Sequence, residues 1–459
     1  MLGISFTNIK RVRMRFVSLA LTMVLGVYAT DSSAAIRSFF NNRADRSYID
    51  PVHNIPRPGD DLEAVIVAEM NKAQRSIWVA VQELRLPAIA KVLAAKKRAG
   101  LDIRVILEDS YNHDVVSRPR SGDGSEQDNP DGSYDAIRMR ELVALTDANN
   151  DGRVTAAEMA DRDAIFILNE ARVPIDDDTH DGSQGSGLMH HKFVVVDGKT
   201  TIMSSANFTA SCIHGDKLVA ISRGNANALM VVDSVALASL FAEEHVEMWA
   251  GRYGTKKRFR GARSVTIAGK KFTVQFSPTS RAAGWNSSTN ALIANTLKTA
   301  TSSIKSALFV FSEQRLADAM QQAQDRAEIS VVVDAKFAFR PYSEVLDLLG
   351  VALPDTVTRT IETGNAPWRR PAERVGVPSL ARGDVLHHKF AVVDAQKVIF
   401  GSHNWSESAN SINDEFAVVV EDPTTANNFT REFNRVTARA RWGVPPHIIR
   451  KAEYALGAY

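Results

Sequence analysis

Cysteine is almost absent from this sequence, since Cys212 is the only one among 459 residues. An intrachain disulfide is therefore excluded, and a hydrophobic core must hold the fold together. The chain also lacks an excess of either charge, because 55 Lys and Arg nearly balance 53 Asp and Glu. A formal net charge of +2 is too small to argue for nucleic acid or an anionic membrane as a partner, so charge must be considered locally.

Long apolar runs are scarce too, and the one that stands out covers residues 16–29. Four basic residues precede it between positions 10 and 15, and small residues follow at positions 29, 34 and 35. The run is short for a transmembrane helix, so the pattern predicts a cleavable secretory signal over residues 1–35. The expected protein is exported, either periplasmic or secreted, and an uncleaved membrane anchor is the alternative.

Two copies of one short pattern organise the rest of the chain. The first reads His-His-Lys-Phe-Val-Val-Val-Asp over residues 190–197, and the second reads His-His-Lys-Phe-Ala-Val-Val-Asp over residues 387–394. Six residues separate each Asp from a small polar turn that ends in Asn207 or Asn404. The two copies are therefore in register along their whole length, which disfavours a chance pair of core strands with polar starts.

The geometry of a strand explains how the His and Lys of each copy act together. Residues i and i+2 of a strand project to the same side, so His190 pairs with Lys192 and His387 pairs with Lys389. The apolar runs that follow each Lys predict central strands that are buried on both faces.

These residues resemble the HKD motif of the phospholipase D superfamily, which is His-x-Lys-x4-Asp followed by Gly-Ser-x-Asn. The resemblance covers most of the chain after about residue 60. It implies an α/β fold of two similar halves, each a mixed sheet flanked by helices, related by a pseudo-two-fold axis. It also implies a phosphodiesterase that is a monomer with an internal pseudo-dimer and has one active site where the halves meet.

The resemblance implies a role for each polar residue of the two motifs. One histidine attacks phosphorus to form a phosphohistidine, and the other, protonated, gives its proton to the leaving alcohol. We assign the attack to His190 and the proton to His387, although the symmetry of the motifs leaves the reverse order open. Around the phosphoryl oxygens the resemblance places Lys192, Lys389, Asn207 and Asn404.

Three carboxylates complete the implied catalytic set. Asp197 and Asp394 lie five residues beyond each Lys, too far along the strand to touch their own histidine. We expect them to orient backbone groups or partners from the other half. Glu415 fits the place of the carboxylate that holds the nearby histidine in the family. Lys217 stands at that place in the first half, so the orienting group for His190 stays open.

A strand, helix and strand pattern recurs in both halves and sets the expected domains. In the first half it covers residues 76–82, 87–99 and 102–107, and in the second half residues 303–311, 314–327 and 328–333. The expected divisions are a first half over 36–250, a basic linker over 251–264 and a second half over 265–459. The linker contains Lys256, Lys257, Arg258, Arg260 and Arg263. This run is either solvated or borders the cleft and attracts phosphate.

The first half is longer than the second, and the additional residues contain an EF-hand-like loop, Asp-Ala-Asn-Asn-Asp-Gly-Arg-Val-Thr-Ala-Ala-Glu, over residues 147–158. It fits the twelve-residue calcium pattern within an expected helix-loop-helix near 134–169. The predicted ligands are Asp147, Asn149, Asp151, Arg153 through its carbonyl, Thr155 and Glu158. Because no second full loop is visible, a weak calcium site that stabilises the chain is expected. An acidic loop without metal is the alternative, and the implied chemistry requires no metal.

The motifs do not fix the substrate, because the family contains phospholipases, phospholipid synthases and nucleases that share one chemistry. The export signal and the near-neutral charge favour a phospholipid at a membrane surface. The compact second motif and the basic stretches favour an exported nuclease that cleaves DNA or RNA. A noncatalytic calcium-dependent binding module is a third class, and the retention of His and Lys in both motifs argues against it.

Overall fold

The computed structural model describes residues 35–455 apart from 42, 44, 118–132, 181–186, 356–357 and 362–363. The predicted secretory signal therefore lies almost entirely outside the described residues. Within the described ranges, no helix is long and apolar enough to cross a membrane.

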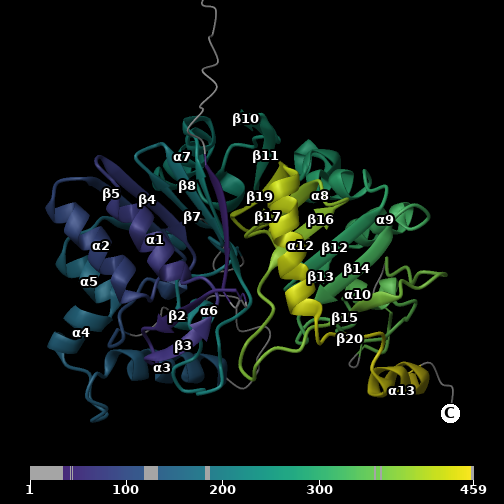
Figure 1. The fold of residues 1–459 in the computed structure, drawn as a ribbon, viewed down its shortest axis with the longest axis horizontal. Helices are drawn as coiled ribbons and strands as arrows, with labels where there is room; N and C mark the ends of the chain where they lie inside the picture. The colour runs from purple at the N-terminus through teal and green to yellow at the C-terminus, as the bar shows by residue number, and fades with distance from the viewer. Residues whose placement is uncertain are drawn as a thin grey trace, which may run out of the picture.

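Two mixed sheets form the two halves of the molecule, side by side in Figure 1. The first sheet has the order β1-β9-β8-β7-β4-β5-β6. Its strands are β1 Ile36–Phe40, β4 Ser76–Val81, β5 Asp102–Leu107, β6 Ile175–Asp177, β7 Lys192–Val196, β8 Thr200–Ser204 and β9 Ala228–Asp233. Strand β4 pairs in parallel with β5 and antiparallel with β7.

The second sheet repeats this arrangement with the order β10-β11-β19-β17-β16-β12-β14-β15-β20. Its strands are β10 Arg263–Ile267, β11 Lys270–Ser277, β12 Ser303–Leu308, β14 Glu328–Val333, β15 Arg374–Val377, β16 Lys389–Val393, β17 Lys397–Gly401, β19 Glu415–Glu421 and β20 Arg441–Trp442. Strand β12 pairs in parallel with β14 and antiparallel with β16, so β7 and β16 occupy equivalent positions. The prediction of two similar halves with mixed sheets is confirmed.

Helices cover both faces of the two sheets. They are α1 Leu62–Asn71, α2 Pro87–Arg98, α3 Ser133–Thr146, α4 Ala156–Arg162, α5 Ala164–Glu170, α6 Ala210–Ile213, α7 Val235–Trp249, α8 Thr289–Leu297, α9 Gln314–Ala323, α10 Glu344–Leu348, α11 Glu407–Ser411, α12 Pro423–Thr437 and α13 Pro446–Ala455. Two small pairings complete the architecture, the hairpin of β2 Ser47–Asp50 with β3 Ile55–Pro58, and β13 Phe311–Ser312 with β18 Trp405–Ser406. The expected strand, helix and strand units correspond to β4-α2-β5 and β12-α9-β14.

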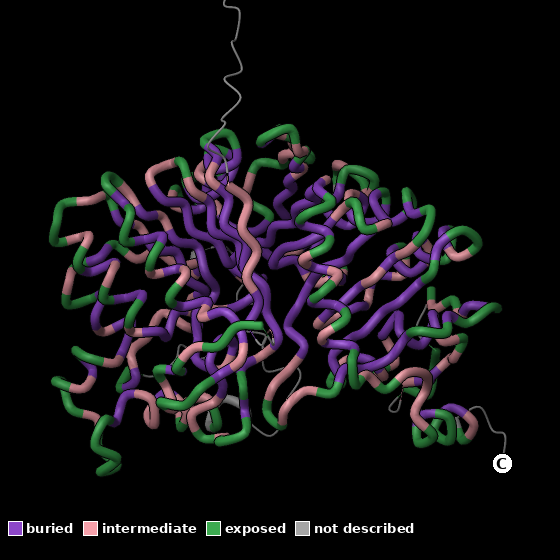
Figure 2. Tube along the Cα trace, viewed as in Figure 1, coloured by how far each residue is buried: buried purple, intermediate pink, exposed green. Residues whose placement is uncertain are grey.

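The hydrophobic core is continuous across the two halves, as the buried interior of Figure 2 shows. All five residues of β7 and all five of β16 are buried, as their apolar runs predict. Phe193 of the first sheet packs against Phe416 of the second with ring centroids 6.5 Å apart, and Phe241 of α7 lies 5.4 Å from Phe416. Burial of each such side chain contributes about 1.5–3 kcal/mol. The two halves therefore share one core.

The basic run predicted as a linker is partly buried instead of being fully solvated. Lys257 is 2.7 Å from Asp414 and also contacts Glu244 of α7. Arg260 pairs with Glu247 of the same helix. These ion pairs fix the connection between the halves.

Candidate active site

The two HKD motifs meet at the boundary between the halves, where β7 and β16 begin. The backbone N–H of His190 donates to the Asp414 carbonyl at 3.0 Å, and that of His387 donates to the Ala226 carbonyl at 3.0 Å. Each motif histidine is therefore held by main chain of the opposite half. This crossed pairing brings the two motifs into one cluster.

His190 faces a carboxylate that comes from the second half. Its Nδ1 lies 2.8 Å from Glu415 Oε2, and Glu415 is fully buried. Burial lowers the pKa of His190 well below its usual range, and the nearby charges of Lys192 and Lys389 lower it further. Burial also raises the pKa of Glu415 to about 8, although Lys192 partly opposes this shift.

His387 faces an amide that comes from the first half. Its Nδ1 lies 3.1 Å from Asn227 Oδ1. The Asn227 amide nitrogen donates to the carbonyls of Cys212 at 2.9 Å and Asn225 at 3.2 Å, which fixes the oxygen toward the histidine. Burial lowers the pKa of His387 well below its usual range, followed by the charge of Lys389.

The expectation that Glu415 holds the histidine of its own half, with Lys217 as its counterpart, is wrong. The Ser205 N–H donates to the Ala228 carbonyl as the Ser402 N–H donates to the Phe416 carbonyl. Asn227 therefore occupies the position of Glu415. The loop after Asn207 is longer than the loop after Asn404. The comparison of the two sequences therefore aligned Lys217, instead of Asn227, with Glu415. Lys217 instead donates from Nζ to the Val52 carbonyl at 2.9 Å.

Both motif lysines are buried beside the histidines. Lys192 Nζ donates to the His190 carbonyl at 2.9 Å and to Gln82 Oε1 at 3.3 Å, and Lys389 Nζ donates to the His387 carbonyl at 2.8 Å. Burial lowers the pKa of Lys192 to about 8, although Glu415 partly opposes it. Burial and the charge of Lys192 lower the pKa of Lys389 well below its usual range. An anion between the two ammonium groups would relieve this repulsion.

Gln82 is a further residue of the cluster, and sequence reasoning missed it. Its Oε1 accepts from Asn207 Nδ2 at 3.1 Å as well as from Lys192. Phe309 is its counterpart in the second half, because Phe309 N–H donates to the His388 carbonyl as Gln82 N–H donates to the His191 carbonyl. The Phe309 ring lies 4.8 Å from the His387 ring and 4.9 Å from Lys389 Nζ. Sequence position could have indicated both residues, because Gln82 directly follows β4 and Phe309 directly follows β12.

The Oδ1 atoms of Asn207 and Asn404 are both buried, and neither has a hydrogen-bond partner among the described residues. In both asparagines of the predicted set, Oδ1 therefore accepts no hydrogen bond from a described residue.

Asp197 and Asp394 are not part of this cluster, because they lie at the opposite ends of β7 and β16. Asp197 accepts from the Arg75 N–H at 2.7 Å and the Ser76 N–H at 2.9 Å. Asp394 accepts from the Ser303 N–H at 2.9 Å. Both have φ of 55°, a left-handed conformation that Asp tolerates. They fix the starts of β4 and β12 within their own halves.

A second set of carboxylates supports the residue before each motif histidine. Met189 N–H donates to Glu108 Oε2 at 2.6 Å and to Asp178 Oδ2 at 3.0 Å. Burial raises the pKa of Glu108 well above its usual range, and Asp178 raises it further. Burial raises the pKa of Asp178 to about 7. Among the described residues, Glu108, Asp109 and Asp178 are the one acidic group whose ligand atoms lie within 4.8 Å of one another.

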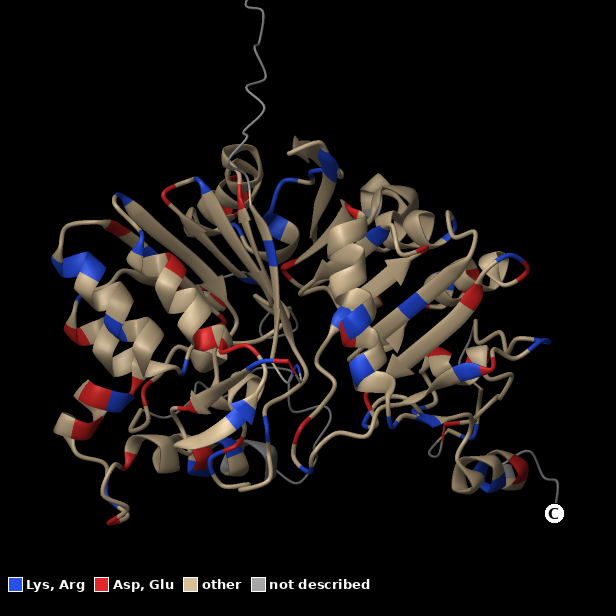
Figure 3. Ribbon diagram, in the orientation of Figure 1, with Lys and Arg blue, Asp and Glu red and all other residues tan. Residues whose placement is uncertain are grey.

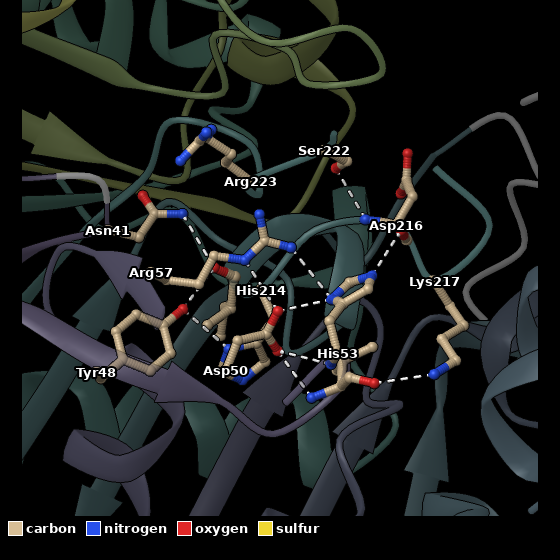
Figure 4. Close-up of polar contacts among 12 residues, drawn as sticks. Asn41, Tyr48, Asp50, His53, Arg57, His214, Asp216, Lys217, Ser222 and Arg223 are labelled. Atoms are coloured by element: carbon tan, nitrogen blue, oxygen red, sulfur yellow. Dashed lines mark hydrogen bonds and ion pairs between the residues drawn. The ribbon is translucent and has the colours of Figure 1, made fainter. Parts of the chain in front are cut away.

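A network of polar contacts surrounds the β2–β3 hairpin (Figure 4). Asp50 Oδ2 lies 2.6 Å from His53 Nδ1 and accepts from Arg57 Nε at 2.9 Å. His53 Nε2 lies 3.1 Å from the Asp216 carbonyl. The hairpin thus contacts the loop that follows α6.

The same loop reaches the second motif. Ser222 Oγ contacts the Asp384 carboxylate, and Arg223 N–H donates to Asp384 Oδ2 at 2.8 Å. Asp384 lies three residues before His387. Glu141 of α3 accepts from backbone N–H groups of this loop, including one at 3.1 Å. This loop therefore connects α3 with the second half.

The predicted calcium loop lies between α3 and α4. Asp147 Oδ2 accepts from Gly152 N–H at 2.9 Å, and Gly152 has φ of 80°, which favours glycine. Glu158 accepts from the N–H groups of Thr155 at 2.9 Å and Ala148 at 2.8 Å. The other predicted ligands, Asn149, Asp151 and Arg153, lie in the same loop. Calcium binding stays a prediction.

Comparisons with known proteins agree with this architecture. A family model described as "Cardiolipin synthase, PLD-like domain" matches residues 66–249 and 293–437. A mitochondrial cardiolipin hydrolase of Danio rerio is 44% identical over 48 residues, which are 10% of this chain and 21% of that protein. The mouse protein of the same name (Mus musculus) is 41% identical over 51 residues, 11% of this chain and 23% of that protein. The chain thus spans about a fifth of the length of these curated relatives.

One solved structure shows the same fold over most of its length. The phosphatidylserine synthase of Haemophilus influenzae has a TM-score of 0.52 and 10% identity, and the match covers 92% of this chain and 95% of that one. Nuc of Salmonella typhimurium, a phospholipase D family member, has a TM-score of 0.29 and 20% identity over 38% of this chain and 99% of that one. With a family model that matches more than half of its residues, the chain belongs to the phospholipase D-like family described as "Cardiolipin synthase, PLD-like domain".

Proposed function

We propose that the chain is a phospholipase D-type phosphodiesterase that hydrolyses phospholipid phosphodiester bonds. The observation that carries this proposal is the buried meeting of two histidines and two lysines with one carboxylate, Glu415. Burial lowers the pKa of both lysines and both histidines, and the neighbouring positive charges lower it further for His190, His387 and Lys389. A phosphodiester anion supplies the missing negative charge and restores the charged forms.

The different partners of the two histidines support a division of roles. Nδ1 of His190 faces Glu415, which leaves Nε2 for attack on phosphorus. The ring becomes positive when Nε2 bonds to phosphorus. That charge lowers the pKa of the facing Glu415 carboxyl and favours its ionised form, which stabilises the ring. Nδ1 of His387 faces the neutral amide of Asn227 instead of a carboxyl group, so a protonated His387 releases its proton more readily.

The reaction then proceeds in two displacements. His190 Nε2 forms a bond to phosphorus while the bond from phosphorus to the leaving oxygen breaks, and His387 donates a proton to that oxygen. Water next gives a proton to His387 and attacks phosphorus, which breaks the bond to His190. Both lysines hold the non-bridging oxygens throughout, with the amides of Asn207 and Asn404 beside them.

The lipid substrate is supported by the family model and by the matched segments of the cardiolipin hydrolases. The expected export signal over residues 1–35 also supports action at a membrane outside the cytoplasm. Nucleic acid is the competing substrate within the same chemistry.

Parallel assays of purified protein test the proposal. Phosphatidylcholine, cardiolipin and plasmid DNA are offered with and without chelator, alongside Lys192→Ala and a control, Lys199→Ala. Lys199 is exposed in the turn between β7 and β8, at the far end of the motif strand. We expect lipid turnover that Lys192→Ala abolishes and Lys199→Ala retains. Cleavage of DNA alone would assign a nuclease, and no turnover of any substrate would overturn the enzyme assignment.

We further propose that residues 147–158 bind calcium as a stabilising ion. Support comes from the complete oxygen ligand set and from the left-handed Gly152 in the turn. The loop's ligands would include the carboxylates of Asp147 and Glu158. Calcium would hold α3 against α4, and no step of the phosphodiester chemistry runs through it.

A further inference from the structure

A cavity of about 770 Å³ lies outside the catalytic cluster, in the second half of the molecule. Its volume is typical of pockets that hold small molecules or headgroups. Its walls are formed by residues between 335 and 342, by Asp355, Thr358 and Thr360, and by one face of α13. None of the lining residues belongs to either HKD motif. We name it the α13 cavity.

The α13 cavity carries an excess of positive charge. Lys336, Arg340 and Lys451 line it, whereas Asp355 is the one acidic residue among the described lining residues. The Asp355 carboxylate accepts from the Thr358 N–H at 2.8 Å. Lys336 acts electrostatically on Asp216 and Asp334, which lie outside the cavity lining. Three cations against one carboxylate in one hollow favour an anionic ligand.

The wall of the cavity is attached to the second catalytic motif. Arg340 Nε donates to the Lys336 carbonyl at 3.0 Å, which fixes the direction of the guanidinium. The Asp334 carboxylate accepts from Lys336 N–H at 2.9 Å and from Leu386 N–H at 2.7 Å. Leu386 directly precedes His387. The cavity therefore lies on a segment that starts at the active site.

Ring packing and charge place this segment at the rim of the cluster. Phe337 packs on Phe309 with centroids 4.8 Å apart, and Phe309 packs in the same way on His387. Lys336 also acts across the boundary on Asp216 of the first half. Burial raises the pKa of Asp216 to about 6, and Lys336 offsets part of that rise. The segment that forms one wall of the α13 cavity is thus connected by packing to His387 and by charge to Asp216.

The helix beside the cavity has the character of an interfacial helix. Ile448 and Ala452 are buried, whereas Ile449 and Tyr454 are 43% and 73% exposed next to Arg450. Helix α13 lies at the lower edge of the second half in Figure 1, and Figure 3 marks both basic and acidic positions along it. Basic and apolar residues exposed together are typical of helices that lie on anionic bilayers.

We propose that the α13 cavity binds the phosphate headgroup of an anionic phospholipid while α13 lies on the lipid surface, next to the catalytic cluster. Phe339, Pro341 and Ile448 line the cavity and can contact the glycerol and first methylenes of a lipid. A nucleic acid strand would instead favour a continuous track of cations with aromatic platforms. The inference rests on the proposed action on phospholipids and names the surface at which that action occurs.

Vesicle binding tests the inference separately from turnover. The full chain is sedimented with phosphatidylcholine vesicles that contain or lack phosphatidylglycerol. The variants are Arg340→Ala, Lys451→Ala and their double variant, with Lys199→Ala as the charge-matched control. Each cation near an anionic surface contributes a factor of about five in affinity, so the double variant should bind about 30-fold more weakly. Lys199→Ala should bind like the parent.

A variant that blocks the cavity without changing charge separates a pocket from a merely basic surface. Thr358 lines the cavity and is exposed, so Thr358→Trp should fill space there. We expect it to weaken binding to anionic vesicles and to short-chain phosphatidylglycerol in calorimetry, and turnover of the soluble substrate bis(p-nitrophenyl) phosphate should persist. Inorganic phosphate is the second calorimetric ligand, and it should bind more weakly than the lipid.

The outcomes separate two kinds of failure. Only the inference would be overturned if the parent, the double variant and Thr358→Trp bound vesicles equally while the soluble phosphodiester was still turned over. Tight binding of inorganic phosphate with no preference for the lipid would also overturn it. The same holds if the variants lost binding to DNA but kept binding to vesicles. Absence of all phosphodiester turnover, with vesicle binding that depends on Arg340 and Lys451, would instead overturn the proposed function and retain the anionic surface.

Discussion

Replacing Glu415 by Gln should make the protein more stable and less active. Glu415 is fully buried, and its pKa rises from 4.5 to about 8. At pH 7 the folded state keeps a proton on Glu415 that the unfolded state has released. This pH lies 2.5 units above the ordinary pKa of 4.5, and each unit corresponds to about 1.4 kcal/mol. The folded state is thereby penalised by roughly 3 kcal/mol, and Gln removes this penalty. The penalty is absent below pH 4.5, and it grows as the pH rises from 4.5 to about 8.

The same substitution removes the carboxyl group that faces His190 and that, in its ionised form, stabilises a positively charged ring. An interaction of this kind with a charged group is worth about 1.5–3 kcal/mol, so kcat/KM should fall about 10- to 150-fold. The pH profile should change as well. Glu415 raises the pKa of Lys192, so the activity loss caused by deprotonation of Lys192 should begin at lower pH in the variant. The variant should therefore combine higher stability with a narrower pH range.

Glu432→Gln is a matched control with the opposite sign. Glu432 is buried and lies 2.7 Å from His388, outside the catalytic cluster. Burial raises its pKa, but Arg435 and the hydrogen bond with His388 outweigh burial and lower the pKa to about 2. The ionised Glu432 therefore stabilises the folded state above pH 4.5, and this stabilisation is lost as the pH falls toward 2. The variant should lose roughly 3 kcal/mol of the free energy of unfolding at pH 7.

Urea unfolding of both variants at pH 5 and pH 7 measures the free energies, and a soluble phosphodiester measures kcat/KM. The difference between parent and Glu415→Gln should grow between these two pH values. A Glu415→Gln variant that unfolds at lower urea than the parent at pH 7, or that turns over substrate within threefold of it, would refute the reasoning.

Four further outcomes are expected. His190→Ala and His387→Ala should each lose several orders of magnitude in turnover with unchanged circular dichroism, and activity within tenfold of the parent would contradict a shared site. Acid-labile phosphate should be trapped on His190, whereas label on His387 alone would reverse the assigned roles. Calcium at ten times Kd should stabilise the chain by roughly 1.4 kcal/mol, so chelator or Glu158→Gln should lower the melting temperature while activity well below melting survives. Loss of activity in folded Glu158→Gln would instead link calcium to the active site. Asp197→Asn should lower the melting temperature without changing kcat of the folded protein, and a selective loss of kcat would place Asp197 in the chemistry.

The sequence alone determined the chemistry-bearing residues and the two-fold plan. An apolar run after each Lys leaves a strand no stable place except the middle of a sheet, and β7 and β16 are buried throughout. The spacing His-x-Lys then fixes which side chains lie together at the start of each strand. Local patterns of this kind depend on a few neighbouring residues, and they are therefore readable without a fold.

Tertiary structure decided which residues face one another across the halves. Glu415 meets His190, and Asn227 meets His387, because main-chain hydrogen bonds cross the boundary in both directions. Sequence spacing could not show this, since the partners are separated by well over 100 residues and the loop after Asn207 differs in length between the halves. Gln82 was missed for the same reason, as its role follows from the strand order. The pKa shifts also depend on burial, which arises only when both halves share one core.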